Sequence, residues 1–387
     1  MIKVLQLVGG GVAIGGVEKM LLNYYAYMDR SKIHFDFCFY RRSTLVASHI
    51  EFAEYIKDSK IYDLRLFEGA GKLLGYVKAI PKVKKLIREN QYDVVHINAG
   101  RPPLLFSGLI AATLAGAKVK ITHSHSTKGK SGRSRIADIA YAIGFAIVRP
   151  IFRSMSTRLA ACSTEAGKYM YGDNVVNSPK YMPIHNAIIL ESFIYSEDVR
   201  KSVRKELGIK GNTVVYGNIG RFSLQKNHFF LIEVFAAIKK KQSDSVLWLV
   251  GDGELKPDIE KRIKELQLED SILLLGERND PHRLYQGMDA LLFPSLWEGL
   301  SVTAVEAQAS SLPVFASTNI SPEHQLTDRI YFIDLSKGGA FWADYILRKM
   351  AEAPNRMNMS EQITRSGYNI EEEAQSLQES YIRLVKK

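Results

Sequence analysis

A chain of 387 residues, 46% of them hydrophobic and 24% charged, has the composition of a globular protein, and its length predicts two domains of roughly 200 residues. Its only cysteines are Cys38 and Cys162, which excludes a disulfide framework or a cysteine metal site and predicts buried thiols in a reducing compartment. The net charge of +11 comes from residues 1–186, which hold 27 Lys and Arg against 13 Asp and Glu.

The first predicted element is a strand over 2–8 that runs into glycines, unlike the charged and then apolar segments of a signal peptide. No later stretch is long and apolar enough for a transmembrane helix. Residues 104–117 are too few, and 136–152 contain Asp138 and Arg149. We therefore expect a cytoplasmic protein.

Short apolar strands alternate with helix-period segments along the chain. The predicted strands are 2–8, 34–40, 93–97, 118–122, 158–162, 213–219, 245–250, 271–275, 290–293, 312–316 and 330–333. The predicted helices include 17–28, 76–90, 103–116, 136–152, 227–241, 256–266 and 301–310. Such alternation is typical of parallel sheets covered by helices, and two successive series predict an α/β protein with two Rossmann-like domains.

The boundary between the two series is expected within 184–212, where a polar helix-like segment and two glycines separate them. The predicted domains are 1–186 and 187–369. The final segment, 370–387, forms an amphipathic helix, and in two-domain α/β enzymes such a helix can return to the first domain.

A glycine-rich turn follows the first strand, and residues 9–17 read GGGVAIGGV. Such a turn lets backbone N–H groups approach a phosphate at a helix N-terminus. The spacing does not match the dinucleotide fingerprint, because Ile14 stands where its last glycine belongs. We interpret it as a phosphate-approach loop of unspecified type, with a flexible turn as the alternative.

The strand at 118–122 is followed by a pair of histidines, His123 and His125. A histidine at this strand end is placed to face a ligand from the first domain. We expect the two side chains to point to opposite sides, so that at most one faces the ligand. No third ligand for a zinc ion is evident nearby.

In the second series, residues 217–228 read GNIGRFSLQKNH, and Arg221 and Lys226 follow a strand end. Basic side chains at the carboxyl end of a parallel strand point into the crevice where α/β proteins bind ligands. Arginine can hold two phosphate oxygens and lysine adds a compact charge, so the pair would neutralise a diphosphate. Solvated loop charges are the alternative.

Residues 293–307 read FPSLWEGLSVTAVEA, a loop after a strand followed by a helix that is expected to begin near Leu300 and Ser301. Free N–H groups at this helix N-terminus would seat a phosphate. Glu298 and Glu306 are eight residues apart, and their carboxylates can accept hydrogen bonds from sugar and ribose hydroxyls. Dipole complementarity on a solvated face is the alternative.

Taken together, these residues resemble the family-4 retaining glycosyltransferases over nearly the whole chain. The motifs that carry the resemblance are Gly15-Gly16-Val17-Glu18, His123, His185-Asn186, Arg221 with Lys226, Val250-Gly251-Asp252-Gly253-Glu254, and Glu298 with Glu306. The resemblance implies the GT-B fold, in which two Rossmann-like domains face each other across a cleft. The sequence departs from the family where Ala187 replaces the glycine that often follows Asn186, and His125 competes with His123 for the family's position.

The resemblance also implies roles. Arg221 and Lys226 would hold the diphosphate, and Glu298 the transferred sugar. His123 would contact that sugar near the reaction centre. The remaining donor contacts would come from Gly16, Arg278, Gly299, Leu300, Ser301 and Glu306. No cofactor or metal ion is expected.

The implied function is retaining transfer of a hexose-type sugar, with a UDP-sugar as the expected donor, to a glycan or polyprenyl-pyrophosphate-linked acceptor in capsule or exopolysaccharide assembly. A nucleotide-sugar epimerase on the same fold and a nonenzymatic nucleotide-sugar binder are the alternatives.

The basic first half is expected to serve the acceptor. Residues 118–135 contain six basic residues and no acidic one, and the apolar helix 136–152 follows them. This combination suits an anionic membrane face and predicts a peripheral position on the inner face of the plasma membrane. A buried core helix at 136–152 is the alternative. No nucleic-acid partner is expected, because no recognised motif accompanies the charge.

Overall fold

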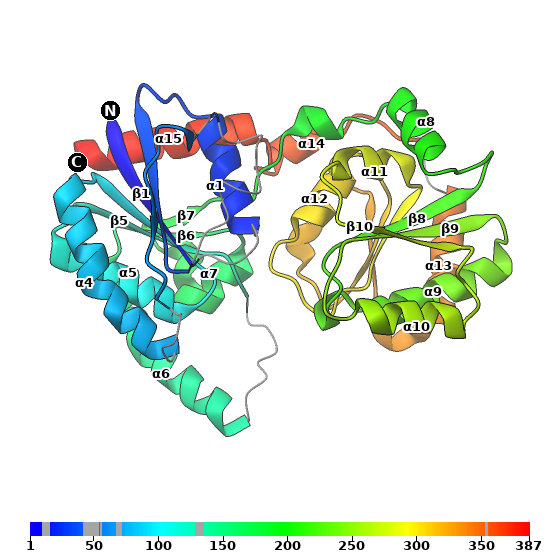
Figure 1. Cartoon of the computed structure of the whole chain (residues 1–387), viewed down its shortest axis with the longest axis horizontal. Helices are drawn as coiled ribbons and strands as arrows, with labels where there is room; N and C mark the ends of the chain where they lie inside the picture. Colours follow the sequence, from blue (N-terminus) through cyan, green and yellow to red (C-terminus); the bar gives the residue numbers. More distant parts are fainter. Residues whose placement is uncertain (10–15, 42–53, 55, 67–71, 128–134, 353–354) are drawn as a thin grey trace. The chain divides into compact units, whose positions relative to one another are not determined.

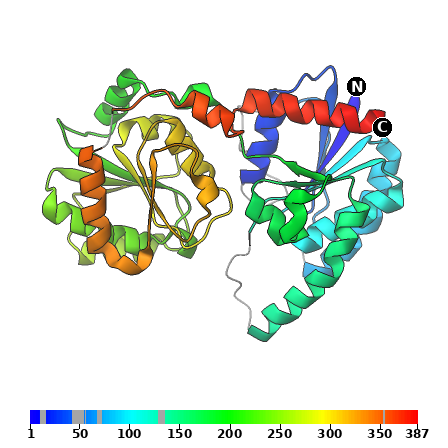
Figure 2. The same ribbon diagram turned by 180° about the vertical axis from the view of Figure 1, so that it is seen from behind.

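The computed structural model of the protein describes residues 1–9, 16–41, 54, 56–66, 72–127, 135–352 and 355–387. The chain divides into two compact units, shown in Figures 1 and 2. Unit 1 comprises residues 1–187 together with 370–387, and unit 2 comprises residues 188–369. The terminal helix α15 (Ile370–Lys386) therefore belongs to the same unit as the N-terminus.

Unit 1 is built on a seven-stranded parallel sheet with the order β3-β2-β1-β4-β5-β6-β7. Its strands are β1 (Ile2–Val8), β2 (Ile33–Phe39), β3 (Ile61–Asp63), β4 (Val94–Ala99), β5 (Val119–Ser124), β6 (Arg158–Ala161) and β7 (Tyr181–Pro183). Every residue of β4 is buried, because helices cover both faces of the sheet. Strands β3 and β7 were not predicted, and each has only three residues.

The helices of unit 1 form two layers (Figures 1 and 2). Helices α4 (Lys72–Asn90), α5 (Pro102–Ala115) and α6 (Arg135–Met155) lie side by side on one face of the sheet. Helix α1 (Gly16–Ala26) packs with α15 on the other face, and α7 (Thr164–Tyr171) follows β6. Gly108 allows α5 to approach the sheet, because a Cβ atom there would lie 3.0 Å from Ile97.

Unit 2 has a six-stranded parallel sheet with the order β10-β9-β8-β11-β12-β13. Its strands are β8 (Val214–Ile219), β9 (Ser245–Val250), β10 (Ile272–Gly276), β11 (Ala290–Phe293), β12 (Val314–Ser317) and β13 (Ile330–Ile333). Its α-helices are α8 (Glu197–Glu206), α9 (His228–Lys241), α10 (Lys256–Glu265), α11 (Pro281–Gly287), α12 (Val302–Ala309), α13 (Gly338–Glu352) and α14 (Ser360–Arg365). Helix α13 packs against α9, and α11 packs against α8.

Each sheet has a point where the direction of strand succession reverses. In unit 1 it lies between β1 and β4, and in unit 2 between β8 and β11. Ligands of open α/β sheets bind beyond the carboxyl ends of the strands at such a point. The prediction of two Rossmann-like α/β domains is therefore confirmed. Both cysteines are free and buried, also as predicted.

Candidate active site

The loops that follow β8 and β11 lie together at the switch point of unit 2. The backbone N–H of Leu296 donates to the carbonyl of Gln225 at 2.8 Å, and the Asn227 side chain donates to the Pro294 carbonyl at 3.2 Å. These bonds fix the loop that carries Lys226 against the loop that carries Glu298. Strand adjacency therefore brings together two residues that are far apart in the sequence.

Lys226 and Glu298 form an ion pair that is nearly closed to solvent. Lys226 Nζ lies 2.8 Å from Glu298 Oε1, and their side chains are 13% and 7% exposed. Gln225 Nε2 donates to Glu298 Oε2 at 2.9 Å, so both carboxylate oxygens have a donor. Lys226 Nζ also lies 5.0 Å from the ring centre of Phe293. The pair places a cation and a hydrogen-bond acceptor side by side beyond the strand ends.

Gly220 makes room for this lysine, because a Cβ atom there would lie 2.9 Å from Lys226 Cε. The loop after β9 packs equally closely against residues 220–222 at the same edge of the sheet. A Cβ atom on Gly251, whose φ is +134°, would lie 2.2 Å from the Gly220 carbonyl oxygen. One on Gly253 would lie 2.4 Å from the Phe222 carbonyl oxygen. The glycines at 251 and 253 are thus required by backbone packing against residues 220–222.

Arg221 is placed differently from Lys226. Its side chain is 75% exposed, and its Nε atom lies 3.2 Å from Glu254 Oε2. Its guanidinium therefore extends into solvent at the same strand end, in a contact with Glu254 that solvent screens. The Arg278 side chain is bonded to Asp280 and Glu206.

Helix α12 begins at Val302, one residue after the start of the predicted helix 301–310. The backbone N–H of Ser301 donates to His324 Nε2 at 3.0 Å. His324 Nδ1 lies 2.8 Å from the Ser321 carbonyl oxygen, which can only accept. The proton is therefore on Nδ1 and His324 is neutral, in agreement with a pKa that burial lowers from its usual value.

Glu306 lies on α12 and is buried. Its Oε2 atom accepts a hydrogen bond of 2.9 Å from the Tyr285 hydroxyl. Burial and the neighbouring Glu306 carboxylate raise the pKa of Tyr285 well above its usual value, so this hydroxyl remains a donor. Gly299 and Leu300 lie between Glu298 and this helix. The sequence did not single out Gln225, Tyr285 and His324, although His324 follows β12, the neighbour of β11 at the same sheet edge.

In unit 1, His123 lies in β5 and His125 directly follows it, and their side chains lie on the same side. The ring centres of His123 and His125 are 3.8 Å apart, so the expectation that they point to opposite sides was wrong. Residues two apart on an extended segment share a face. His123 is completely buried beside His96, with ring centres 5.3 Å apart, whereas His125 is partly exposed. Of the two, His125 is the one a ligand can reach in this structure.

A directed hydrogen-bond chain runs behind His125. Its Nε2 atom donates to Asn98 Oδ1 at 3.1 Å, and Asn98 donates to Gln6 Oε1 at 2.9 Å. Gln6 Nε2 lies 3.4 Å from the Tyr381 hydroxyl, which lies 2.7 Å from His96 Nδ1. Tyr381 belongs to α15, so the terminal helix completes this network. Burial lowers the pKa values of His125 and His96 to about 3, and both rings are neutral.

Gly16 is the first residue of α1 and is exposed. No atom lies within 4 Å of the position that a Cβ would take, so packing within the described structure does not require a glycine there. The rest of the glycine-rich loop, residues 10–15, lies outside the described residues. The basic residues at 128, 130 and 133 lie outside them as well.

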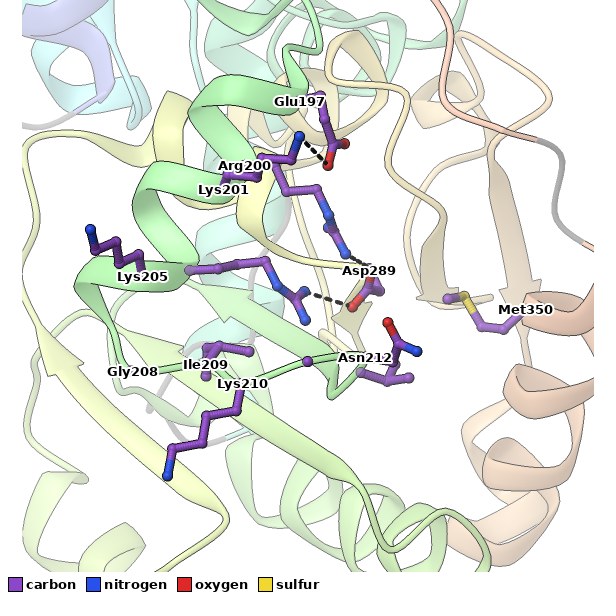
Figure 3. A pocket seen from close by; sticks show the side chains of 13 residues that line it. Glu197, Arg200, Lys201, Lys205, Gly208, Ile209, Lys210, Asn212, Asp289 and Met350 are labelled. Carbon is purple, nitrogen blue, oxygen red and sulfur yellow. Dashed lines mark hydrogen bonds and ion pairs between the residues drawn. The ribbon is translucent and has the colours of Figure 1, made fainter.

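A surface pocket of about 730 Å³ occupies the opposite edge of the unit 2 sheet (Figure 3). It lies where β8 and β11 begin. Arg200 and Arg204 line it, and both bind Asp289, at 2.7 and 3.2 Å. They also donate to backbone carbonyls at the end of α11. These arginines therefore hold α8 against α11, and the pocket is separate from the strand ends that carry Lys226.

Among the described residues, no group of three His, Cys, Asp or Glu side chains is arranged to hold a metal ion. No described helix is both long and apolar enough to cross a membrane.

Comparisons with known proteins agree with this architecture. Residues 199–365 match the family model of glycosyl transferases group 1, and residues 15–187 match that of the glycosyl transferase 4-like domain. The putative glycosyltransferase EpsF of Bacillus subtilis is 30% identical over 386 residues, covering 96% of this chain and 94% of EpsF. The UDP-Gal:alpha-D-GlcNAc-diphosphoundecaprenol alpha-1,3-galactosyltransferase of Escherichia coli is 30% identical, covering 63% of this chain and 62% of that enzyme.

The crystal structure of Anabaena HepE in complex with UDP and glucose superimposes with a TM-score of 0.71 at 18% identity, covering 100% of this chain and 98% of HepE. Two parallel Rossmann-like sheets with these neighbours define the GT-B fold. The chain belongs to the group 1 glycosyltransferases, with a 4-like N-terminal domain. It is a glycosyltransferase.

Proposed function

We propose that the protein transfers a hexose-type sugar from a UDP-sugar to a polyprenyl-pyrophosphate-linked glycan, with retention of configuration, in capsule or exopolysaccharide assembly. The observation that carries this proposal is the Lys226–Glu298 pair at the switch point of unit 2. The ammonium suits the donor diphosphate and the carboxylate suits hydroxyls of the transferred sugar. The Glu298 carboxylate only accepts hydrogen bonds, which suits it to contact with sugar hydroxyls.

The chemical step develops negative charge on the departing β-phosphate oxygens. Lys226 and Arg221 lie in the loop after the strand end where this phosphate would lie, and donors aimed at developing charge usually make the largest contribution to catalysis. Backbone N–H groups at Gly299 and Leu300 would add to this stabilisation. Ser301 would do so after its N–H leaves His324. We assign the ribose hydroxyls to Glu306, and a backbone contact with the base to Arg278.

Unit 1 is assigned the acceptor, with Gly16 and His125 in contact with the donor. A neutral imidazole at His125 would accept or donate a hydrogen bond to a sugar hydroxyl and would not act as a charged acid. We place His125, rather than the buried His123, in this role because only His125 reaches the surface of unit 1. The open space at Gly16 suits the close approach of a phosphate to its backbone N–H.

The names of relatives support the proposed UDP-sugar donor and the proposed polyprenyl-linked acceptor. The Escherichia coli enzyme uses UDP-Gal and acts on a diphosphoundecaprenol-linked sugar. A 28% identical Staphylococcus aureus relative is named for capsular polysaccharide biosynthesis. HepE binds UDP. We therefore place the protein in the cytoplasm, where nucleotide-sugars are made, and expect no nucleic-acid partner.

We also propose that transfer needs no divalent metal, since two basic side chains are available to balance the diphosphate. The test is nucleotide release in the presence of excess EDTA. Activity that EDTA removes and Mg²⁺ or Mn²⁺ restores would contradict this part of the proposal.

The function is tested by incubating the protein with UDP-, GDP- and ADP-sugars and a short-chain polyprenyl-pyrophosphate-linked sugar. We expect UDP-sugars to raise the apparent melting temperature by mass action, and UDP release to require the acceptor. NMR of the product should show the anomeric configuration of the donor. An inverted product would refute retention, and an isomerised free donor without acceptor glycosylation would identify an epimerase. No nucleotide release with any donor would refute the proposal.

A further inference from the structure

Helix α6 is apolar on two opposite faces. Phe145 and Phe152 point inward and belong to the core of unit 1. On the outward face, Ile143, Ile147 and Ile151 recur at every fourth residue and are 58%, 68% and 41% exposed. This spacing aligns the three side chains in one stripe along the helix. The described part of this helix therefore packs in the core on one face and exposes apolar side chains on the other.

Figures 1 and 2 show α6 extending beyond the other helices of unit 1. Ala146 and Pro150 are also exposed and lie within the same outward face. Isolated exposed apolar side chains are common on proteins, but a contiguous apolar stripe marks an interaction surface. A stripe of isoleucines therefore needs an apolar partner.

Helix α4, which lies beyond α5 in the same helix layer, contributes positive charge. Helix α4 carries five basic residues against one acidic residue among its described side chains, namely Lys78, Lys82, Lys84, Lys85, Arg88 and Glu89. Arg153 on α6 is exposed as well. Further apolar side chains, Leu74 and Val77 on α4, are 51% and 56% exposed. Arg88 ties α4 to α5 by donating to the Leu114 carbonyl at 2.9 Å.

We propose that the layer formed by α4, α5 and α6 is the docking surface for an anionic lipid bilayer, with the isoleucine stripe of α6 entering the headgroup region. Lysines and an exposed apolar stripe in one helix layer complement anionic phospholipids, which attract the charges while the apolar side chains leave water. A second copy of this chain would instead bring like charges together. The inference rests on the proposed function, because a polyprenyl-linked acceptor lies in such a bilayer.

The position of α6 agrees with this role. It follows β5 and begins on the side of the sheet where β4 and β5 end, which is also the side that carries His125. A bilayer against this helix layer would therefore lie along the flank of unit 1, and a lipid-linked sugar would need to reach only the adjoining sheet edge.

The test is flotation of the full chain with vesicles of phosphatidylcholine containing roughly 30% phosphatidylglycerol, at low and at high salt. We expect binding to the anionic vesicles that falls at high salt, because screening weakens the lysine contribution. Ile147→Glu should reduce binding roughly tenfold or more, since an apolar contact becomes a repelled charge. Lys78→Glu/Lys82→Glu should also reduce it and should flatten the salt dependence.

Val176→Glu is the matched control, because Val176 is 39% exposed in unit 1 but lies outside α4, α5 and α6. It should bind vesicles as the wild type does, and all variants should keep the wild-type melting temperature. Equal binding of Ile147→Glu and Val176→Glu would overturn the proposal. The proposal would also be overturned if the wild type did not bind vesicles but formed a dimer that the Ile147→Glu substitution dissociates.

The two proposals can fail separately. Transfer to a short-chain, water-soluble acceptor without flotation would leave the function intact and overturn the docking surface. Flotation that depends on Ile147, without transfer from any donor, would support the docking surface and refute the proposed function.

Discussion

At the residue scale, Lys226 and Glu298 are tested best as a pair. Lys226→Ala should lower kcat/KM roughly 100-fold or more, because it removes a cation aimed at the leaving phosphate. It should also cost roughly 3 kcal/mol in the free energy of unfolding, since Glu298 is left buried without its ion-pair partner.

The double variant Lys226→Ala/Glu298→Gln separates these effects. It should recover part of the lost stability and none of the activity, because no charge remains buried while both functional groups are missing. Urea unfolding and steady-state kinetics of the two single variants and the double variant give the measurement. A double variant as unstable as the sum of the single ones would show that the pair is not coupled.

Alanine variants of His125 and His123 should show which histidine contacts the donor and which one only packs in the core of unit 1. His125→Ala should reduce kcat with little change in melting temperature, because its ring is partly exposed. His123→Ala should lower the melting temperature, because it opens a cavity between His96 and His125 in a fully buried site. Kinetics and thermal unfolding of both variants decide the assignment. A His123→Ala variant with normal stability and the larger loss of kcat would restore His123 to the site.

At the scale of elements, the strands of both sheets could be predicted because parallel, doubly covered strands form continuous apolar runs. The three-residue strands β3 and β7 are too short to show such a run. Helix α13 was missed because it opens with Gly338 and Gly339, which favour a turn. Contacts such as Glu298 with Lys226 depend on which strands are neighbours, which sequence spacing does not encode. His324 was missed for the same reason, since only the order of β11 and β12 brings it to Ser301.

Removal of helix α15 should destabilise unit 1 and leave unit 2 folded. Tyr381 is fully buried in unit 1 and bonds His96, and the side chain of Gln378 accepts a hydrogen bond from Asp29 N–H at 2.7 Å. A chain ending at Asn369 should therefore leave unit 1 without part of its core while unit 2 keeps its own.

Tryptophan fluorescence reports on unit 2 alone, because the three tryptophans of the chain all belong to it. They are Trp248, Trp297 and Trp342. The truncated chain should keep a cooperative unfolding transition by tryptophan fluorescence and lose a large part of its helical circular dichroism signal. The conservative variant Tyr381→Phe should keep both signals and lose about 1–2 kcal/mol in the free energy of unfolding, because its hydroxyl is bonded to both His96 and Gln6. Full retention of the helical signal after truncation would contradict the assignment of α15 to unit 1.

At the scale of the whole molecule, buried histidines make stability depend on pH. Burial lowers the pKa of His96 and His125 to about 3 and that of His228 to about 4, and it lowers those of His123 and His324 as well. Below about pH 6.5 the unfolded chain protonates these side chains and the folded chain does not. Stability should therefore fall as the pH decreases from about 6.5, by up to about 1.4 kcal/mol per pH unit for each histidine.

The effect of Glu373 on the pH dependence of stability is opposite to that of the histidines. Burial raises its pKa to about 7, so between about pH 7 and 4.5 the folded chain binds a proton that the unfolded chain does not, and stability rises as the pH falls. One such carboxyl cannot offset five histidines, so the net effect of acidification from pH 7.5 to 5.5 is destabilising. Glu373→Gln removes the opposing group, and it should raise the melting temperature at pH 7.5 and make the loss toward pH 5.5 steeper. Thermal unfolding of the wild type and the variant at these two pH values measures the difference. If the wild type melts at the same or a higher temperature at pH 5.5 than at pH 7.5, the histidines titrate normally in the folded state.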